Sequence, residues 1–122
     1  MTDLSKLPVH VILRPEDIEG DEAALRKIYN NLSPEADIAV ELWPTLSYAA
    51  KKDVMDSAQC GDVAAAAEDL LLEAVENGTV VPQWVIDAGD QLLEHWGWSP
   101  NVEKACAALQ ARLDEHNRGG GE

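Results

Sequence analysis

Between Asp21 and Leu113, apolar residues recur every three to four positions with charged residues between them. This spacing places apolar side chains on one face of an α-helix, and it predicts an amphipathic helix wherever it is sustained. Prolines, glycines and short polar runs interrupt the pattern. The sequence therefore predicts six helices, in residues 21–32, 33–43, 47–59, 60–78, 82–98 and 100–113.

The segment 60–78, CGDVAAAAEDLLLEAVENG, carries the clearest helical pattern. It has a Gly-Asp start and an Asn-Gly stop, and glycine readily adopts the left-handed conformation that ends helices. Ser33 and Ser99 each precede a proline, and we expect them to be N-caps with proline at the first helical position. Six short helices joined by short links predict an all-α protein, a compact six-helix bundle.

The two ends of the chain differ from this pattern. KLPVHVIL is rich in β-branched residues and too short for a helix, so it predicts one strand at Val9–Leu13 or an extended arm. RPEDIEGDE predicts a turn or a single helical turn, and NRGGGE predicts a frayed tail. The expected organisation is an N-terminal arm in 1–20, a bundle in 21–116 and a flexible tail in 117–122.

The charge of the chain is one-sided. The 122 residues include 23 acidic and 9 basic side chains, a net charge of −14. Such a surface repels phosphate backbones, so direct nucleic-acid binding is not expected, and a basic protein surface is a better partner. The alternative interpretation is that this charge only keeps the protein soluble. No apolar run reaches the roughly 20 residues of a membrane span, and the opening residues lack the features of a secretory signal, so we expect a soluble, cytoplasmic protein.

Candidate catalytic and metal-binding groups are scattered. The histidines, His10, His95 and His116, stand on different elements without metal-ligand spacing, and Cys60 and Cys106 have no local partner. Because Cys106 lies on an apolar stripe, we interpret it as a small core residue. No phosphate-binding glycine loop is present, and no cofactor, metal or catalytic residue is predicted.

Two further groups of residues have alternative interpretations. Glu68, Asp69 and Glu73 suggest acid–base chemistry, but a solvated face fits better because the helix turns them away from its apolar stripe. The tryptophans near the fifth helix, Trp84, Trp96 and Trp98, suggest an aromatic platform for a base or methyl-lysine, although packing at the end of the bundle is more usual. The sequence as a whole indicates a non-enzymatic binding protein.

The order of elements in LWPTLSYAAKKDVMDSAQCGDVAAAAEDLLLEAVENGTVVPQWVIDAGDQLL suggests a family. Leu46 follows Pro44, Gly61 precedes Ala65 and Ala66, a leucine run occupies 70–72, and Trp84 opens the fifth helix. Over roughly residues 23–113, this pattern resembles the caspase-recruitment domain, a six-helix death fold. It is most similar to the versions found in cytosolic viral-RNA sensor helicases.

The resemblance implies homotypic docking in defence or innate immune signalling, in which charged faces of helical bundles meet. The implied acidic positions lie on the second, third and fourth helices, at Glu35, Asp37, Glu41, Asp53, Asp56, Asp69 and Glu73. Helical spacing alone places Asp62 and Glu76 on the same face of the fourth helix as Asp69 and Glu73. The implied basic counter-face consists of Arg26, Lys27, Lys51 and Lys52.

Two other functions remain open. One is a small acidic inhibitor of phage type, like anti-restriction and anti-CRISPR proteins in composition, whose carboxylates imitate the charge of a duplex and block a nucleic-acid-binding defence enzyme. The other is an accessory subunit of a larger complex.

Overall fold

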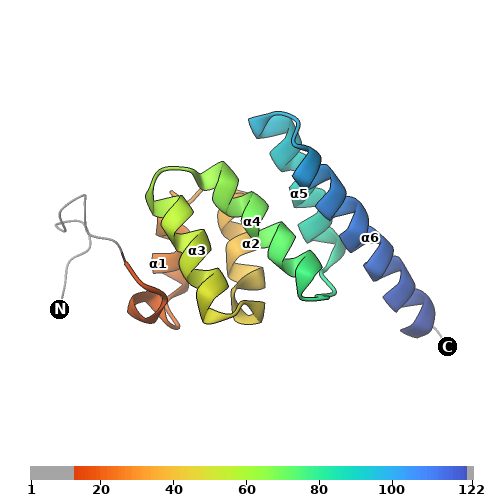
Figure 1. Ribbon diagram of the computed structural model, residues 1–122, viewed down its shortest axis with the longest axis horizontal. Helices are drawn as coiled ribbons and strands as arrows, with labels where there is room; N and C mark the ends of the chain where they lie inside the picture. The colour runs from red at the N-terminus through yellow and green to blue at the C-terminus, as the bar shows by residue number, and fades with distance from the viewer. Residues whose placement is uncertain (1–12, 121–122) are drawn as a thin grey trace.

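The computed structural model describes residues 13–120 (Figure 1), in which all regular secondary structure is helical and no strand occurs. The predicted all-α fold with six helices is confirmed. The helices are α1 (Glu22–Ile28), α2 (Glu35–Leu42), α3 (Tyr48–Gln59), α4 (Val63–Glu76), α5 (Gln83–Trp96) and α6 (Pro100–Gly120), with short 3-10 helices η2 (Pro15–Ile18) and η3 (Trp43–Thr45).

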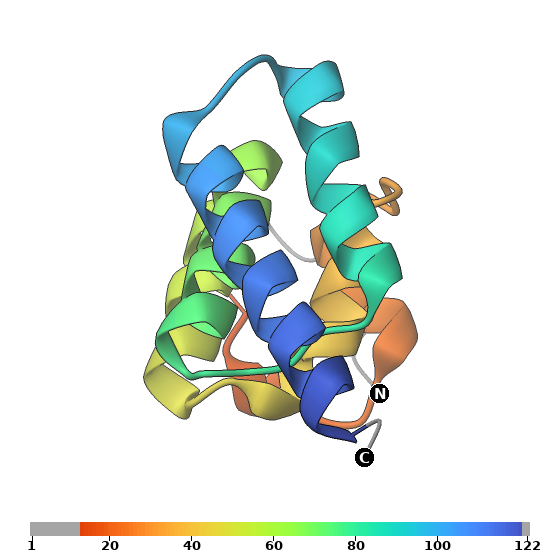
Figure 2. The same ribbon diagram turned by 90° about the vertical axis from the view of Figure 1, so that its right-hand side faces the viewer.

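Helix α4 lies at the centre of the arrangement. It packs against α2 and α3 on one side and against α5 and α6 on the other. Helices α5 and α6 form an antiparallel hairpin, which lies in front of the other helices in Figure 2. The molecule is therefore a group of four helices extended by a long hairpin, with α4 shared between them (Figure 1).

Several helix ends follow the sequence signals. The Asp62 carboxylate accepts a hydrogen bond from the Ala65 N–H at 3.0 Å, and so caps α4. Gly78 follows α4 with φ of +70°, the left-handed conformation expected of it. The Ser99 hydroxyl accepts from the Val102 N–H at the start of α6, as predicted.

The predicted cap of α2 is wrong. The N-cap position belongs to Pro34, and the helix begins at Glu35. The Ser33 hydroxyl donates a hydrogen bond to the Asp37 carboxylate at 2.7 Å.

The chain ends differ in part from the prediction. Of the proposed strand Val9–Leu13, only Leu13 lies within the described residues, and its backbone exchanges two hydrogen bonds with the Gln59 side chain. Pro15–Ile18 forms the single helical turn that was predicted. The tail is shorter than predicted, since residues 117–120 continue α6 and only 121–122 lie outside the described part. No helix breaker stands before Gly119, and Arg118 suits the negative end of the helix dipole.

The core is aliphatic and gathers around α4. Leu70, Leu71, Ala66, Ala67 and Ala74 are all fully buried there. Around them lie buried residues of the other helices, including Tyr29, Ile38, Leu42, Val54, Met55, Val85, Leu92 and Leu109. Since one helix supplies the middle of the whole core, its apolar residues hold both halves of the molecule together.

Helices α5 and α6 approach closely at Gly89. A Cβ atom added to Gly89 would lie 2.4 Å from Cys106 Sγ and 3.4 Å from Leu71 Cδ1. The first distance is far inside van der Waals contact, and both side chains around it are buried. The absence of a side chain at Gly89 therefore sets how near the two helices come.

We expect Leu71→Ala to lower the free energy of unfolding by about 2–5 kcal/mol, from lost burial and the cavity left behind. Urea denaturation measures this loss. Leu72→Ala, at a half-buried position of the same helix, should cost clearly less. Equal losses in the two variants would contradict the central position of Leu71.

We expect Gly89→Ala to destabilise the protein by about 1–3 kcal/mol through overpacking. Cys106→Ala removes the sulfur that the new methyl group meets, so the double variant should be more stable than the sum of the two single changes predicts. A double-mutant cycle by urea denaturation measures this coupling. Additive effects would show that the contact does not limit the approach of the helices.

Candidate functional site

Four carboxylates form a cluster on the surface of α3 and α4, which we call the α3–α4 acidic patch: Asp53, Asp69, Glu73 and Glu76. Burial raises the pKa of Glu73, and the charges of Glu76, Asp53 and Asp69 raise it further. Burial likewise raises the pKa of Asp69, followed by the charges of Glu68, Asp53 and Asp62. Each member lies within the field of others of the same sign, so a cation placed here would be attracted.

The patch is a subset of the acidic positions expected from the sequence, and several of the others are engaged within the molecule. The Asp37 carboxylate accepts a hydrogen bond from Arg26 Nη1 at 2.6 Å, and the Asp56 carboxylate forms an ion pair with Lys52 at 3.4 Å. Asp62 caps α4, while Glu41 is exposed on α2. The sequence-predicted acidic face is therefore divided: Asp37 and Asp56 form ion pairs, whereas no member of the α3–α4 acidic patch forms one within residues 13–120.

Glu35 does not lie on the surface as the sequence suggested. Its side chain is 1% exposed, and Oε1 has no hydrogen-bond partner within the described residues. Only the family resemblance placed Glu35 on an acidic face, and in the structure the chain enters α2 with this first residue turned inward. Tyr29 is a second buried residue whose hydroxyl has no such partner, and burial and the charge of Asp69 raise its pKa.

The residues of the predicted basic counter-face lie on α1 and α3. Arg26 forms ion pairs with Glu22 and Asp37. Its hydrogen bond to Asp37 raises the pKa of the guanidinium most, and its hydrogen bond to Glu22 raises it further. Lys52 is paired on α3, the Lys51 ammonium lies 5.5 Å from the Trp43 ring centre, and Lys27 is exposed on α1. Three of the four cations therefore make contacts within the molecule.

Arg112 has a structural function that sequence reasoning missed. From α6, its guanidinium donates hydrogen bonds to the carbonyls of Ala74, Val75 and Thr79 at 3.1–3.2 Å. Ala74 and Val75 are in the last turn of α4 and Thr79 is in the link that follows, so Arg112 adds donors to carbonyls that otherwise depend on the few N–H groups beyond the helix end. No local sequence signal connects residues so far apart along the chain.

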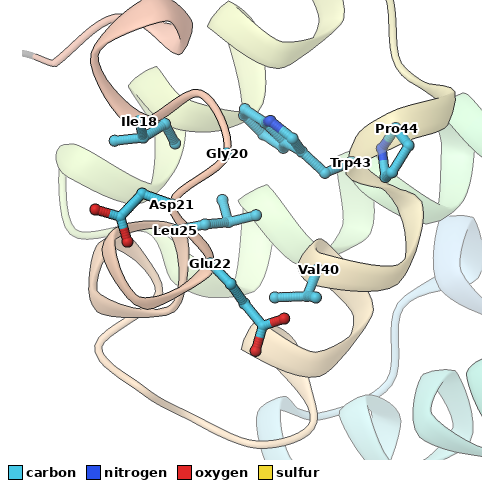
Figure 3. Close-up of a pocket in the computed structure, with 8 residues that line it drawn as sticks. All are labelled: Ile18, Gly20, Asp21, Glu22, Leu25, Val40, Trp43 and Pro44. Atoms are coloured by element: carbon cyan, nitrogen blue, oxygen red, sulfur yellow. The ribbon is translucent and has the colours of Figure 1, made fainter.

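A first hollow, of about 220 Å³, lies between η2–α1 and α2–η3. Leu25, Val40 and the Trp43 indole border it, with the carboxylates of Asp21 and Glu22 at its rim (Figure 3). Its volume falls below the roughly 300–1,000 Å³ of pockets for drug-sized ligands. The first hollow is thus a shallow apolar depression.

A second hollow, of about 260 Å³, lies where α4 meets the α5–α6 turn. Trp96, Trp98 and Glu68 are among its lining residues. The two indoles are 50% and 70% exposed, so they do not pack the end of the bundle. Trp84 lies apart from them, beside Arg26, Asp37, Val40 and Glu41 in another depression.

The cysteines do not form a reactive site. Cys106 is buried, and burial with the charge of Asp90 raises the pKa of its thiol to about 11. A thiol at such a pKa is protonated at neutral pH and is a poor nucleophile. Cys60 is exposed at the end of α3. The prediction that Cys106 is a core residue is confirmed.

Within residues 13–120, no three His, Cys, Asp or Glu side chains come together in a way that could hold a metal ion. None of the helices in the same range combines the length and apolar character that a membrane span requires.

Comparisons of the chain with models of protein families, with curated proteins and with solved structures find no match.

Because the pKa of Asp69 is higher in the folded chain than in the unfolded chain, the folded state binds more protons between the two values. Stability therefore falls as pH rises through that window, and the loss persists at neutral pH. We expect Asp69→Asn to raise the free energy of unfolding at pH 7 by less than about 1 kcal/mol, since solvent screens a partly exposed charge. The gain should vanish near pH 3, at which carboxyl groups become protonated.

Urea denaturation at several pH values tests this expectation. The exposed Glu94 of α5 provides a control, and Glu94→Gln should change the stability by no more than about 0.5 kcal/mol. An Asp69→Asn protein less stable than wild type at pH 7 would contradict the repulsion.

Proposed function

We propose that this chain is a non-enzymatic protein-interaction domain that docks onto a basic protein through the α3–α4 acidic patch. The observation that carries the proposal is the gathering of these carboxylates without an ion pair within residues 13–120, where burial first and neighbouring carboxylates second raise the pKa of Asp69 and of Glu73. Repulsion among these like charges destabilises the isolated domain. A cationic surface that covers them offsets the repulsion, so binding of such a surface is favoured.

The internal ion pairs support the same surface. Arg26 and Lys52 neutralise acids elsewhere on α1–α3, yet neither forms an ion pair with a member of the patch. A partner that brings arginine or lysine to this place gains attraction without breaking an existing pair.

The partner that we favour is another helical bundle, as in death-fold docking during defence or innate immune signalling. The resemblance of residues 23–113 to caspase-recruitment domains supports this choice, because it accounts for the order of helices. The patch also occupies two adjacent helices, which suits a compact contact. Imitation of duplex charge would need carboxylates repeated along an axis, about one per 1.7 Å.

Affinity capture from host lysate with three forms of the protein tests the proposal. The patch variant, Asp53→Lys with Glu76→Lys, reverses two exposed members and leaves the buried core untouched. The control, Asp87→Lys with Glu115→Lys, makes the same change in net charge at exposed positions of α5 and α6. We expect the patch variant to lose the partner, with at least a roughly tenfold fall in affinity, and the control to retain it.

Addition of duplex DNA separates the two functions. A basic helical domain that is captured regardless of DNA, and is lost only in the patch variant, supports docking. A nuclease or other DNA-binding enzyme that DNA displaces, with both variants weakened alike, supports the duplex-mimicking inhibitor. Absence of any protein whose capture depends on the patch would overturn the proposal.

A further inference from the structure

The second hollow combines two exposed indoles with a carboxylate. Trp96 and Trp98 flank the α5–α6 turn, and Glu68 reaches the same hollow from α4. The turn itself is made possible by Gly97, whose φ of +95° is open to glycine and unfavourable for other residues. This turn brings two tryptophans only two positions apart to one depression.

Hydrogen bonds hold the polar groups of the hollow in place. The Ser99 hydroxyl, which caps α6, donates to Glu68 Oε1 at 2.6 Å. The Trp98 indole N–H donates to the Glu103 carboxylate. Because that bond uses the edge of the ring, the faces of the Trp98 indole are not involved in it. The hollow is thus preorganised, and no ion pair within residues 13–120 neutralises Glu68.

An organic cation fits this combination of groups. Indole faces attract guanidinium and ammonium groups through the ring quadrupole, and tryptophan does so best among the aromatic residues. A carboxylate beside the rings adds a charge-assisted hydrogen bond. The volume of about 260 Å³ is small for a whole drug-sized ligand, which favours a single side chain.

We propose that the second hollow receives an arginine side chain of a basic protein partner. Arginine is favoured over lysine because its planar guanidinium both stacks on aromatic rings and forms paired hydrogen bonds with carboxylates. This inference rests on the proposed function, since the partner is the basic protein that covers the acidic patch. Helix α4 connects the two places, because Glu68 lines the hollow and Asp69 beside it belongs to the patch.

The test uses the full chain and two short peptides. Acetyl-Gly-Arg-Gly amide carries the guanidinium, and its citrulline counterpart has almost the same shape without the charge. The four indole N–H signals of the protein report where each peptide binds in NMR titrations. We expect the arginine peptide to move the Trp96 and Trp98 signals in a saturable way, with the Trp43 and Trp84 signals nearly unchanged. The citrulline peptide should produce no saturable shift.

Two variants identify the groups responsible. Glu68→Gln keeps an acceptor for Ser99 but removes the charge, and it should weaken the arginine peptide by about three- to fivefold. Trp98→Ala, at a largely exposed position, should abolish the saturable shift at Trp96. The dispersion of the remaining amide signals shows whether each variant is folded.

The outcomes are distinct from those of the proposed function. The patch variant, Asp53→Lys with Glu76→Lys, should still bind the arginine peptide at the hollow even though it loses the partner. Equal binding of the citrulline peptide, shifts confined to Trp43 or Trp84, or unchanged affinity in Glu68→Gln would overturn the assignment of the hollow. Partner capture that depends on the patch would survive any of these results.

Discussion

Burial of the apolar residues of α4 is the interaction on which the rest of the structure depends. Helices α2 and α3 cover one side of α4, and the α5–α6 hairpin covers the other. With Leu70 and Leu71 fully buried, neither group of helices has a complete core without it. Helix α4 is also alanine-rich, which lets the neighbouring helices approach closely and leaves little room for large side chains.

The same central position determines where charge gathers. The residues of α4 that are not fully buried form a strip along one side of the helix, and Glu68, Asp69, Glu73 and Glu76 belong to it. Asp69 and Glu73 are half-buried beside Asp53 of α3, so their charges are poorly screened. At its other edge, the strip brings Glu68 to the tryptophans of the hairpin turn. The acidic patch and the second hollow are thus two parts of one exposed helix surface.

The sequence predicted what local patterns can encode. Periodicity indicated six helices, and Asp62, Gly78 and Ser99 marked helix ends because capping depends on residues a few positions apart. Local patterns did not predict the features that depend on contacts between residues far apart along the chain. The burial of Glu35 depends on how α2 packs against the helices around it, and the hydrogen bonds of Arg112 depend on the position of α6 beside α4. The sequence also indicated the acidic residues of α4, but which acids are neutralised could be decided only by the positions of Arg26 and Lys52.

The contact between Arg112 and the end of α4 has a consequence for cooperativity. Three carbonyls of the α4 terminus and the following link accept hydrogen bonds from a side chain more than thirty residues later. Separation of α6 would remove these three hydrogen bonds and the C-terminal half of the core at the same time, while the Ala74 and Val75 carbonyls would keep only backbone donors, such as the N–H groups of Thr79 and Gly78. The final turn of α4 and the middle of α6 therefore belong to one unit that opens and closes together. Through this link, a partner that binds at the hairpin would also restrict the motion of the helix that carries the acidic patch.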